Sequence, residues 1–175
     1  RLLEIDPENA GVRLNLGMAL ARSGRFEESA TQLEEAARLR PDLPQVRYSL
    51  SLVLAREGKT PEALRLISDL MGLPAGSPGA EERLAWALAT SQEASLRDGA
   101  QAIRLAQRAC DASQYANPAS LDALAAAFAE VGRFGEAAQT AQKAIDKATA
   151  GGQGELAGRI RGRMQLYEAG RPYRE

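Results

Sequence analysis

Hydrophobic positions along the chain recur with two periods, one within a helix and one between helices. Val12, Leu16 and Leu20 fall on one side of a 3.6-residue helix, and the segment that follows shows the same spacing. On the longer scale, Leu16, Leu50 and Leu84 lie 34 residues apart. Repetition of one helical pattern at a fixed interval predicts an array of short helix pairs.

The turns and contacts within each pair follow the same interval. Gly24 and Gly58, also 34 residues apart, separate two helical segments, where a residue that tolerates positive φ ends a helix. Two helices that cross closely need small residues where they touch, because a larger side chain there costs about 1–3 kcal/mol in overpacking. We expect these contacts at Gly17, Ser51, Ala85 and Ala125 on the first helices and at Ser29, Ala63, Ala102 and Ala137 on the second.

Equivalent positions also give the boundaries of the units. The interval stretches to 40 residues between Leu84 and Leu124, and we place the extra length in a longer inter-helix loop at residues 89–98. Thr60-Pro61, Ser77-Pro78 and Asn117-Pro118 predict helix starts, with the residue before proline as N-cap. We predict the end of a preceding repeat at 1–9, repeats at 10–43, 44–77, 78–117 and 118–151, and a C-terminal capping helix and tail at 152–175.

These units resemble the tetratricopeptide repeat (TPR). Leu16-Gly17, Gly24-Arg25-Phe26 and Pro41 match its pattern in the first unit, and Gly132-Arg133-Phe134 matches it in the fourth. The stretch from 84 to 175 also resembles the C-terminal repeat module of large bacterial TPR proteins. The resemblance implies an all-α fold, a right-handed superhelical solenoid of four helix-turn-helix repeats with a C-terminal capping helix. It also implies a non-catalytic scaffold that binds protein or peptide in a concave groove.

In this family the first helix of each pair lines the groove. By repeat position, the resemblance assigns peptide contacts to Leu14, Met18, Arg22, Tyr48, Leu52, Arg56 and Trp86. Glu82 belongs to the same face, and the groove turns acidic in the fourth unit with Asp122 and Glu130. An apolar, aromatic groove flanked by arginines suits an amphipathic helix or an extended peptide. The alternative for these positions, the arginines included, is packing against the neighbouring repeat.

Relatives that grip a peptide carboxylate use Lys, Arg and Asn residues on adjacent first helices. Arg83 matches that set in the register of the first unit, and Asn15 matches in a register opened by an upstream repeat. The other positions of the set differ in either register. The resemblance therefore implies peptide binding without this particular recognition of a carboxylate end.

Composition narrows the function classes. Twenty-two basic and 23 acidic residues give a net charge of −1, which argues against a nucleic-acid binder and an electrostatic membrane clamp. The chain has no histidine and one cysteine, Cys110, which we interpret as a buried small residue, with a reactive thiol as the alternative. Residues 152–157 fit G-x-G-x-x-A, but a helix precedes them, so we interpret them as a turn rather than a nucleotide site. We predict no enzyme activity, catalytic residue, metal or cofactor.

A second hypothesis is a structural or self-associating C-terminal module of a larger bacterial enzyme or membrane protein. Arg1 starts the sequence without a methionine or a signal-peptide pattern, so we expect a piece of a longer chain or a processed product. Leu2, Leu3 and Ile5 would then form an unpaired apolar edge. The sequence lacks a run of eighteen apolar residues, which predicts no membrane insertion of this segment. We favour a cytoplasmic location, for a soluble domain whose parent protein can itself be linked to a membrane. The sequence pattern predicts neither a particular ligand nor an oligomeric state.

Overall fold

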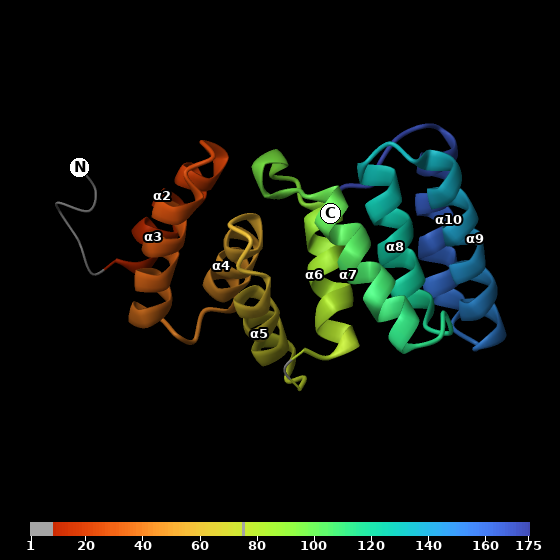
Figure 1. The fold of residues 1–175 in the computed structure, drawn as a ribbon, viewed down its shortest axis with the longest axis horizontal. Coiled ribbons are helices and arrows are strands. Elements are labelled where there is room, and N and C mark those ends of the chain that lie inside the picture. The colour runs from red at the N-terminus through yellow and green to blue at the C-terminus, as the bar shows by residue number, and fades with distance from the viewer. Residues whose placement is uncertain (1–8, 75) are drawn as a thin grey trace. The chain divides into compact units, whose positions relative to one another are not determined.

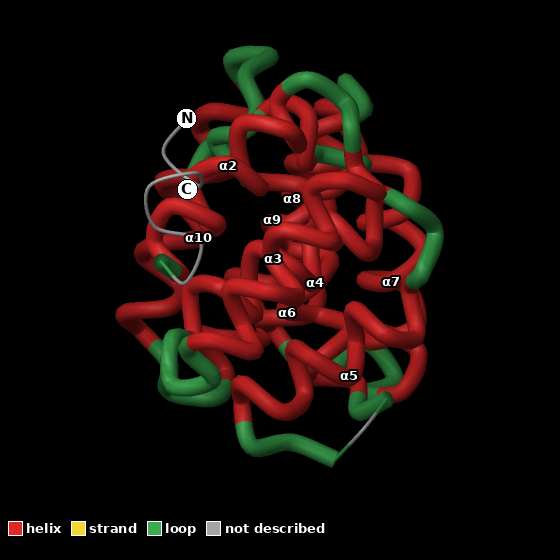
Figure 2. The backbone as a smooth tube through the Cα atoms, turned by 90° about the vertical axis from the view of Figure 1, so that its left-hand side faces the viewer, coloured by secondary structure: helices red, strands yellow, loops and turns green. Residues whose placement is uncertain are grey.

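The computed structural model describes residues 9–74 and 76–175. Within these ranges it contains nine α-helices and one short 3-10 helix, and Figure 2 shows helices and loops without strands in the described part. No helix of that part is long and apolar enough to cross a bilayer. The predicted end of a preceding repeat, including Leu2, Leu3 and Ile5, lies outside the described residues except for Asn9.

The first compact unit runs as far as Gly76 and includes Glu93–Leu96. Successive helices pack on one another, α2 on α3, α3 on α4 and α4 on α5. Gly24 and Gly58, with φ of 75° and 84°, form the turns inside the two pairs. The elements, labelled in Figure 1 except for η1, are α2 (Ala10–Arg22), α3 (Phe26–Leu39), α4 (Pro44–Arg56), α5 (Thr60–Met71) and η1 (Ala94–Leu96).

The second compact unit comprises Ser77–Gln92 and Arg97–Glu175. Here α6 packs on both α7 and α8, α8 packs on α9, and α9 packs on α10. Gly132, with φ of 79°, forms the α8–α9 turn, whereas residues 91–98 connect α6 to α7. The prediction of an all-α chain of successive helix pairs is confirmed. The helices are α6 (Pro78–Thr90), α7 (Gly99–Ala112), α8 (Pro118–Glu130), α9 (Phe134–Ala150) and α10 (Gly154–Glu168).

Two of the three predicted N-caps are confirmed. The Ser77 hydroxyl accepts from the backbone N–H of Ala80, and the Asn117 side chain accepts from that of Ala119. The prediction for Thr60 was wrong, since Thr60 is the first residue of α5 and Lys59 takes the cap position. The glycine turn at Gly58 brings the chain into the helix one residue earlier than the Thr-Pro pair suggests.

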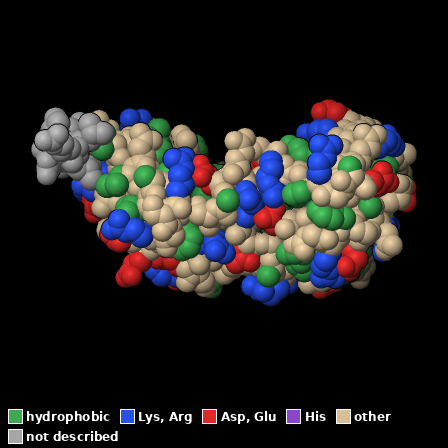
Figure 3. All heavy atoms as spheres, turned by 90° about the horizontal axis from the view of Figure 1, so that it is seen from above, with side chains coloured by type: hydrophobic (Ala, Val, Ile, Leu, Met, Phe, Trp, Pro, Cys, Tyr) green, Lys and Arg blue, Asp and Glu red, His purple; other side chains and the backbone are tan. Residues whose placement is uncertain are grey.

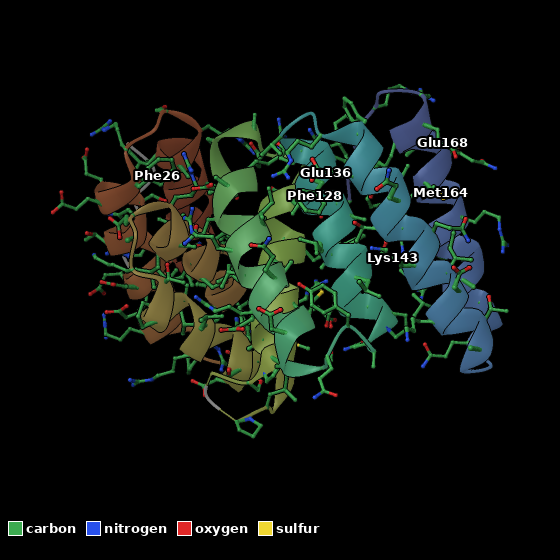
Figure 4. The ribbon with its side chains drawn as sticks, turned by 45° about the vertical axis from the view of Figure 1, so that its right-hand side comes forward. Phe26, Phe128, Glu136, Lys143, Met164 and Glu168 are labelled. Atoms are coloured by element: carbon green, nitrogen blue, oxygen red, sulfur yellow. The ribbon has the colours of Figure 1, made fainter. Side chains whose placement is uncertain are left out.

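The α8–α9 turn shows how the repeat pattern stabilises a helix pair. Arg133 follows the turn glycine, forms an ion pair with Glu136, and places its guanidinium carbon 4.5 Å from the centroid of the Phe128 ring. Figure 4 labels Phe128 and Glu136 side by side at this end of the second unit. Arg25 forms the equivalent ion pair with Glu28 in the first unit.

The helix contacts are built on the small residues that the sequence predicts. All eight positions are buried: Gly17, Ser29, Ser51, Ala63, Ala85, Ala102, Ala125 and Ala137. The Ser29 hydroxyl donates to the Gly17 carbonyl at 2.7 Å, so this small polar side chain is satisfied where α2 and α3 meet. Small residues at these points let the backbones approach, and leucines around them fill the space.

Candidate peptide-binding surface

A cavity of about 380 Å³ lies in the second unit, between side chains of α6, α8 and α10. Glu82 and Trp86 reach it from α6 because residues at i and i+4 share a face of a helix. Asp122 enters from α8 and Arg163 from α10. The name "α6–α8–α10 surface" refers to these four residues together with Arg83, Ala119, Ala123, Leu156 and Arg159. Tyr173 and Glu175, from the segment that follows α10, also line the cavity.

A buried ion pair joins α8 to α10 beneath this surface. The Arg163 guanidinium donates to both carboxylate oxygens of Asp122, with an Nε–Oδ1 distance of 3.1 Å. The two side chains are 11% and 6% exposed. Burial raises the pKa of Asp122, and the nearby Arg163 charge opposes that rise. The paired groups satisfy each other and fix the position of the guanidinium.

Glu82 is a second partly buried carboxylate, held by neutral donors. It accepts from the Ser120 hydroxyl at 2.7 Å and from the Asn117 amide at 3.1 Å. Burial raises the pKa of Glu82, which the two hydrogen bonds counteract and the charge of Asp122 reinforces. The two neutral donors hold the carboxylate in place at this edge of the cavity, and no cation is part of these contacts.

Arg163 also lies against two aromatic rings. Its guanidinium carbon is 5.0 Å from the centroid of the Trp86 ring and 5.6 Å from that of Tyr173. The two ring centroids are 5.8 Å apart at an interplanar angle of 42°. A cation within about 6 Å of a ring is attracted by the ring quadrupole. The cavity lining therefore combines an aromatic pair with a cation already neutralised by Asp122.

Residues 171–175 fold back from the end of α10 onto the same surface. Gly170, with φ of 70°, reverses the chain after the helix. The Arg174 guanidinium lies 2.6 Å from a carboxylate oxygen of Glu130, and the Trp86 indole N–H donates to the Glu175 carboxylate at 3.2 Å. The backbone N–H of Glu175 donates to the Thr90 carbonyl at 2.9 Å. The chain thus places a short peptide of its own on the α6–α8–α10 surface.

Comparison with known proteins identifies the helix pairs. Family models described as tetratricopeptide repeat match residues 1–53 and residues 44–68. Residues 1–68 carry tetratricopeptide repeats. TPR arrays present extended surfaces to other proteins, which supports a general role as a protein-interaction scaffold.

Solved structures of MamA are similar to this chain over most of its length. One, MamA from residue 41 to the end from Desulfovibrio magneticus RS-1, is 18% identical, covers 91% of this chain and 95% of its own, and gives a TM-score of 0.42. Another crystal structure of MamA is 17% identical, covers 87% of this chain and 85% of its own, and gives 0.47. No curated protein sequence matches the chain.

In the first TPR pairs, several residues predicted to contact a peptide pack against other residues of the chain instead. Leu14 is half-buried and packs against the cluster of Ala10, Ala36 and Val46. Leu52 is 3% exposed, so it belongs to the core instead of a surface that a peptide could reach. For both leucines the structure therefore shows the alternative, which is packing against neighbouring helices. Among the other predicted contacts, Asn15 is exposed, and Met18 and Tyr48 are half-buried.

The two predicted groove arginines of the first unit hold a segment of the chain itself. The Arg22 guanidinium donates to the Glu93 carboxylate at 2.6 and 3.0 Å, and this hydrogen bonding lowers the pKa of Glu93. Arg56 donates to the Ser95 carbonyl at 3.0 Å and lies 5.3 Å from the centroid of the Phe26 ring. Sequence reasoning had given residues 93–96 no binding role.

The expected acidic character of the fourth repeat was wrong. Asp122 is neutralised by Arg163, and Glu130 is neutralised by Arg174 and by Arg97, whose Nε lies 2.9 Å away. All three arginines lie outside the periodic repeat positions, so their partnership could not be inferred from the repeat alignment. The spacing of Arg159 and Arg163 on α10, four residues apart, was the available signal for a basic stripe facing α8.

Of the predicted contacts, the structure brings Arg83 and Trp86 together at the α6–α8–α10 surface. An Arg83 guanidinium nitrogen lies 3.8 Å from the Glu175 carboxylate. Cys110, whose alternative was a reactive thiol, is 0% exposed, and burial raises its pKa to about 12, so the thiolate is strongly disfavoured. Among the described residues, no group of three or more His, Cys, Asp or Glu side chains is placed to hold a metal ion.

Proposed function

We propose that the protein is a non-catalytic scaffold that binds an extended peptide of a partner protein on the α6–α8–α10 surface. One observation carries this proposal: the chain's own residues 171–175 are held there through the backbone and through side chains of three different types. A surface that grips one short segment in this way has the contacts needed to grip another.

The chemistry of the surface supports a peptide over other ligands. Trp86 offers an aromatic face, Arg83 and Arg159 offer guanidinium groups, and Glu82 offers a carboxylate within one cavity. Binding energy in protein interfaces is concentrated in such aromatic and arginine anchors. Mixed charges of this kind suit a peptide that carries both apolar and charged side chains.

Nucleic acid is a poor fit for the described surface. Several exposed arginines of the described residues pair with neighbouring carboxylates, as in the ion pairs of Arg25 with Glu28 and Arg40 with Asp42 in the first unit. Figure 3 shows basic and acidic side chains interspersed over the face in view. Phosphate recognition draws its affinity from unpaired positive charge, so we exclude it from the proposal.

In the first unit we keep Asn15, Met18 and Tyr48 as candidate contacts for a second stretch of partner. Asn15 is exposed and the other two are half-buried. Arg22 and Arg56 would become available there if residues 93–96 were displaced. The repeat boundaries at 10–43, 44–77, 78–117 and 118–151, and the capping segment at 152–175, are part of the same proposal.

The test is selection of binders from a random-peptide display library by the full chain. Trp86→Ala should weaken the selected peptides at least tenfold, because it removes the aromatic anchor, and Arg159→Ala should weaken those with acidic residues. Arg161→Ala is the matched control, since Arg161 is exposed on the same helix and is not part of the lining. Circular dichroism checks that each variant stays helical. Peptides that bind Trp86→Ala as well as the unaltered chain would refute the proposal.

A further inference from the structure

We infer that residues 171–175 are an internal ligand of the α6–α8–α10 surface, and that a partner peptide displaces them by presenting the same chemistry. That chemistry is an aromatic, a basic and an acidic side chain at three consecutive positions of an extended segment. The inference rests on the proposed function and names the partner of the same site.

Three consecutive residues of the segment contact side chains of the α6–α8–α10 surface or of Glu130 at the end of α8. The Tyr173 ring lies against Trp86 and under the Arg163 guanidinium. Arg174 forms its ion pair with Glu130 at 2.6 Å. The Glu175 carboxylate accepts from the Trp86 indole and lies 3.8 Å from Arg83. Each position therefore meets a complementary group, which defines an order of side-chain types.

The backbone of the segment is held at the end of α6. The last carbonyls of a helix lack partners within the helix and accept from other groups. Here the Thr90 carbonyl accepts from the Glu175 N–H at 2.9 Å, and the Ala89 carbonyl accepts from the Arg174 side chain at 3.3 Å. A backbone contact of this kind is independent of sequence, so a segment from another protein is able to reproduce it.

The segment is attached weakly enough to leave. The Arg83–Glu175 pair is 40% and 47% exposed, so it contributes little. In the Arg174–Glu130 pair the arginine is 32% exposed and the glutamate 13%. While it is bound, the fully buried Tyr167 hydroxyl has no hydrogen-bond partner among the described residues. Burial raises the pKa of Tyr167, and the charges of Asp122, Arg163 and Arg174 act on it, so it lies near the same ion pairs.

Because residues 171–175 are tethered to the surface, their effective concentration decides how strongly they compete with an external peptide. A short flexible tether gives an effective concentration of about 1 mM. If the free segment binds with a Kd of about 0.1–1 mM, the surface is about 50–90% occupied, and an external peptide loses about two- to tenfold in apparent affinity. This range is measurable with a labelled peptide.

The experiment uses the full chain and a labelled, acetylated and amidated peptide with the sequence of residues 170–175, followed by fluorescence polarisation. In the chain variant Tyr173→Ala with Arg174→Ala, the internal segment loses two of its three anchors. We expect this variant to bind the peptide two- to tenfold more tightly than the unaltered chain. Arg171→Ala is the control within the segment, because Arg171 is exposed, and it should match the unaltered chain. A peptide with the basic and acidic residues exchanged should bind at least tenfold more weakly.

Trp86 gives an independent signal because it is the only tryptophan in the sequence. Its emission should shift to the red in the double variant and shift back when the peptide is added. Equal affinity for the unaltered chain and the double variant would overturn the inference. Light scattering in which the mass of the unaltered chain rises with concentration, and does not in the double variant, would also overturn it, because the segment would then serve a second copy.

Failure of this inference can be told apart from failure of the proposed function. If the peptide of residues 170–175 binds neither chain while displayed peptides still bind in a Trp86-dependent manner, the surface binds partners of other chemistry and the internal-ligand inference falls alone. If displayed peptides also fail to bind, both fall.

Discussion

Substitution of Gly17 by alanine tests the close approach of α2 and α3 on which the helix pair is built. A Cβ atom at Gly17 would lie 2.8 Å from Cγ and 3.0 Å from Cδ2 of Leu33, and 3.3 Å from the Ser29 carbonyl oxygen. Leu33 is 0% exposed, so its side chain has no solvent-filled space to move into. The methyl group can be accommodated only if the two helices separate or Leu33 leaves its rotamer.

Two opposing effects decide the magnitude. Alanine is favoured over glycine inside a helix by about 1 kcal/mol. Overpacking of a filled core costs about 1–3 kcal/mol, and contacts with a core side chain and a backbone oxygen belong in the upper part of that range. We therefore expect Gly17→Ala to lower the free energy of unfolding by about 1–2 kcal/mol. Urea denaturation followed by circular dichroism is the assay, because Trp86 lies in the second unit and does not report directly on this contact.

Gly158→Ala is the matched control for helix propensity. Gly158 is exposed in α10, and a Cβ atom there would meet nothing within 4 Å. The same substitution should raise the stability by about 0.5–1 kcal/mol. If Gly17→Ala proved as stabilising as Gly158→Ala, the argument that the small residues are required by helix contact would be refuted.

Three further predictions concern the second unit. Asp122→Ala should destabilise this unit by about 3 kcal/mol, because Arg163 then keeps a buried charge without its partner. Adding Arg163→Met to the same chain should recover part of the loss. Urea unfolding followed by Trp86 fluorescence measures both effects. Burial raises the pKa of Glu82 above its ordinary value of 4.5, so ionisation of this carboxyl opposes folding. As the pH rises from about 4.5, the unaltered chain should therefore lose stability relative to Glu82→Gln. Parallel curves of unfolding free energy against pH for the two chains would contradict this. The Cys110 thiol should resist iodoacetamide at pH 8 in the native chain and react in urea, as mass spectrometry would show.

The features that sequence predicted are those that the repeat imposes on every unit. Gly24 and Gly132 adopt positive φ, and Ser51 and Ala125 are buried at helix contacts, because each unit solves the same packing problem with the same residue types. Repeat position also predicted Trp86 as a binding residue, and Trp86 lines the surface that we propose for binding. Such local contacts are encoded within a single repeat and are therefore visible in one sequence.

Contacts made by the segments between and after the repeats were not predictable in the same way. Arg22 and Glu93 are separated by 71 residues, and Trp86 and Glu175 by 89, and neither partner on the segment side belongs to a periodic pattern. Repeat position also wrongly predicted Leu52 as a peptide contact. It assigns a residue to a helix face but does not decide whether a neighbouring helix already covers that face.

The two self-contacts share a physical cause that links them to binding. In each unit, residues on first helices that resemble a peptide-binding set engage a segment outside the helices: Arg22 engages Glu93, and Trp86 engages Glu175. A guanidinium or an indole N–H on an inner helix face needs an acceptor, and a nearby stretch of the same chain meets that need at a high effective concentration. A partner that binds where we propose would therefore have to outcompete the chain itself, which favours partners with several anchors over those with one. Arg22 and Trp86, which the sequence marks as binding residues, are for this reason found occupied in the structure.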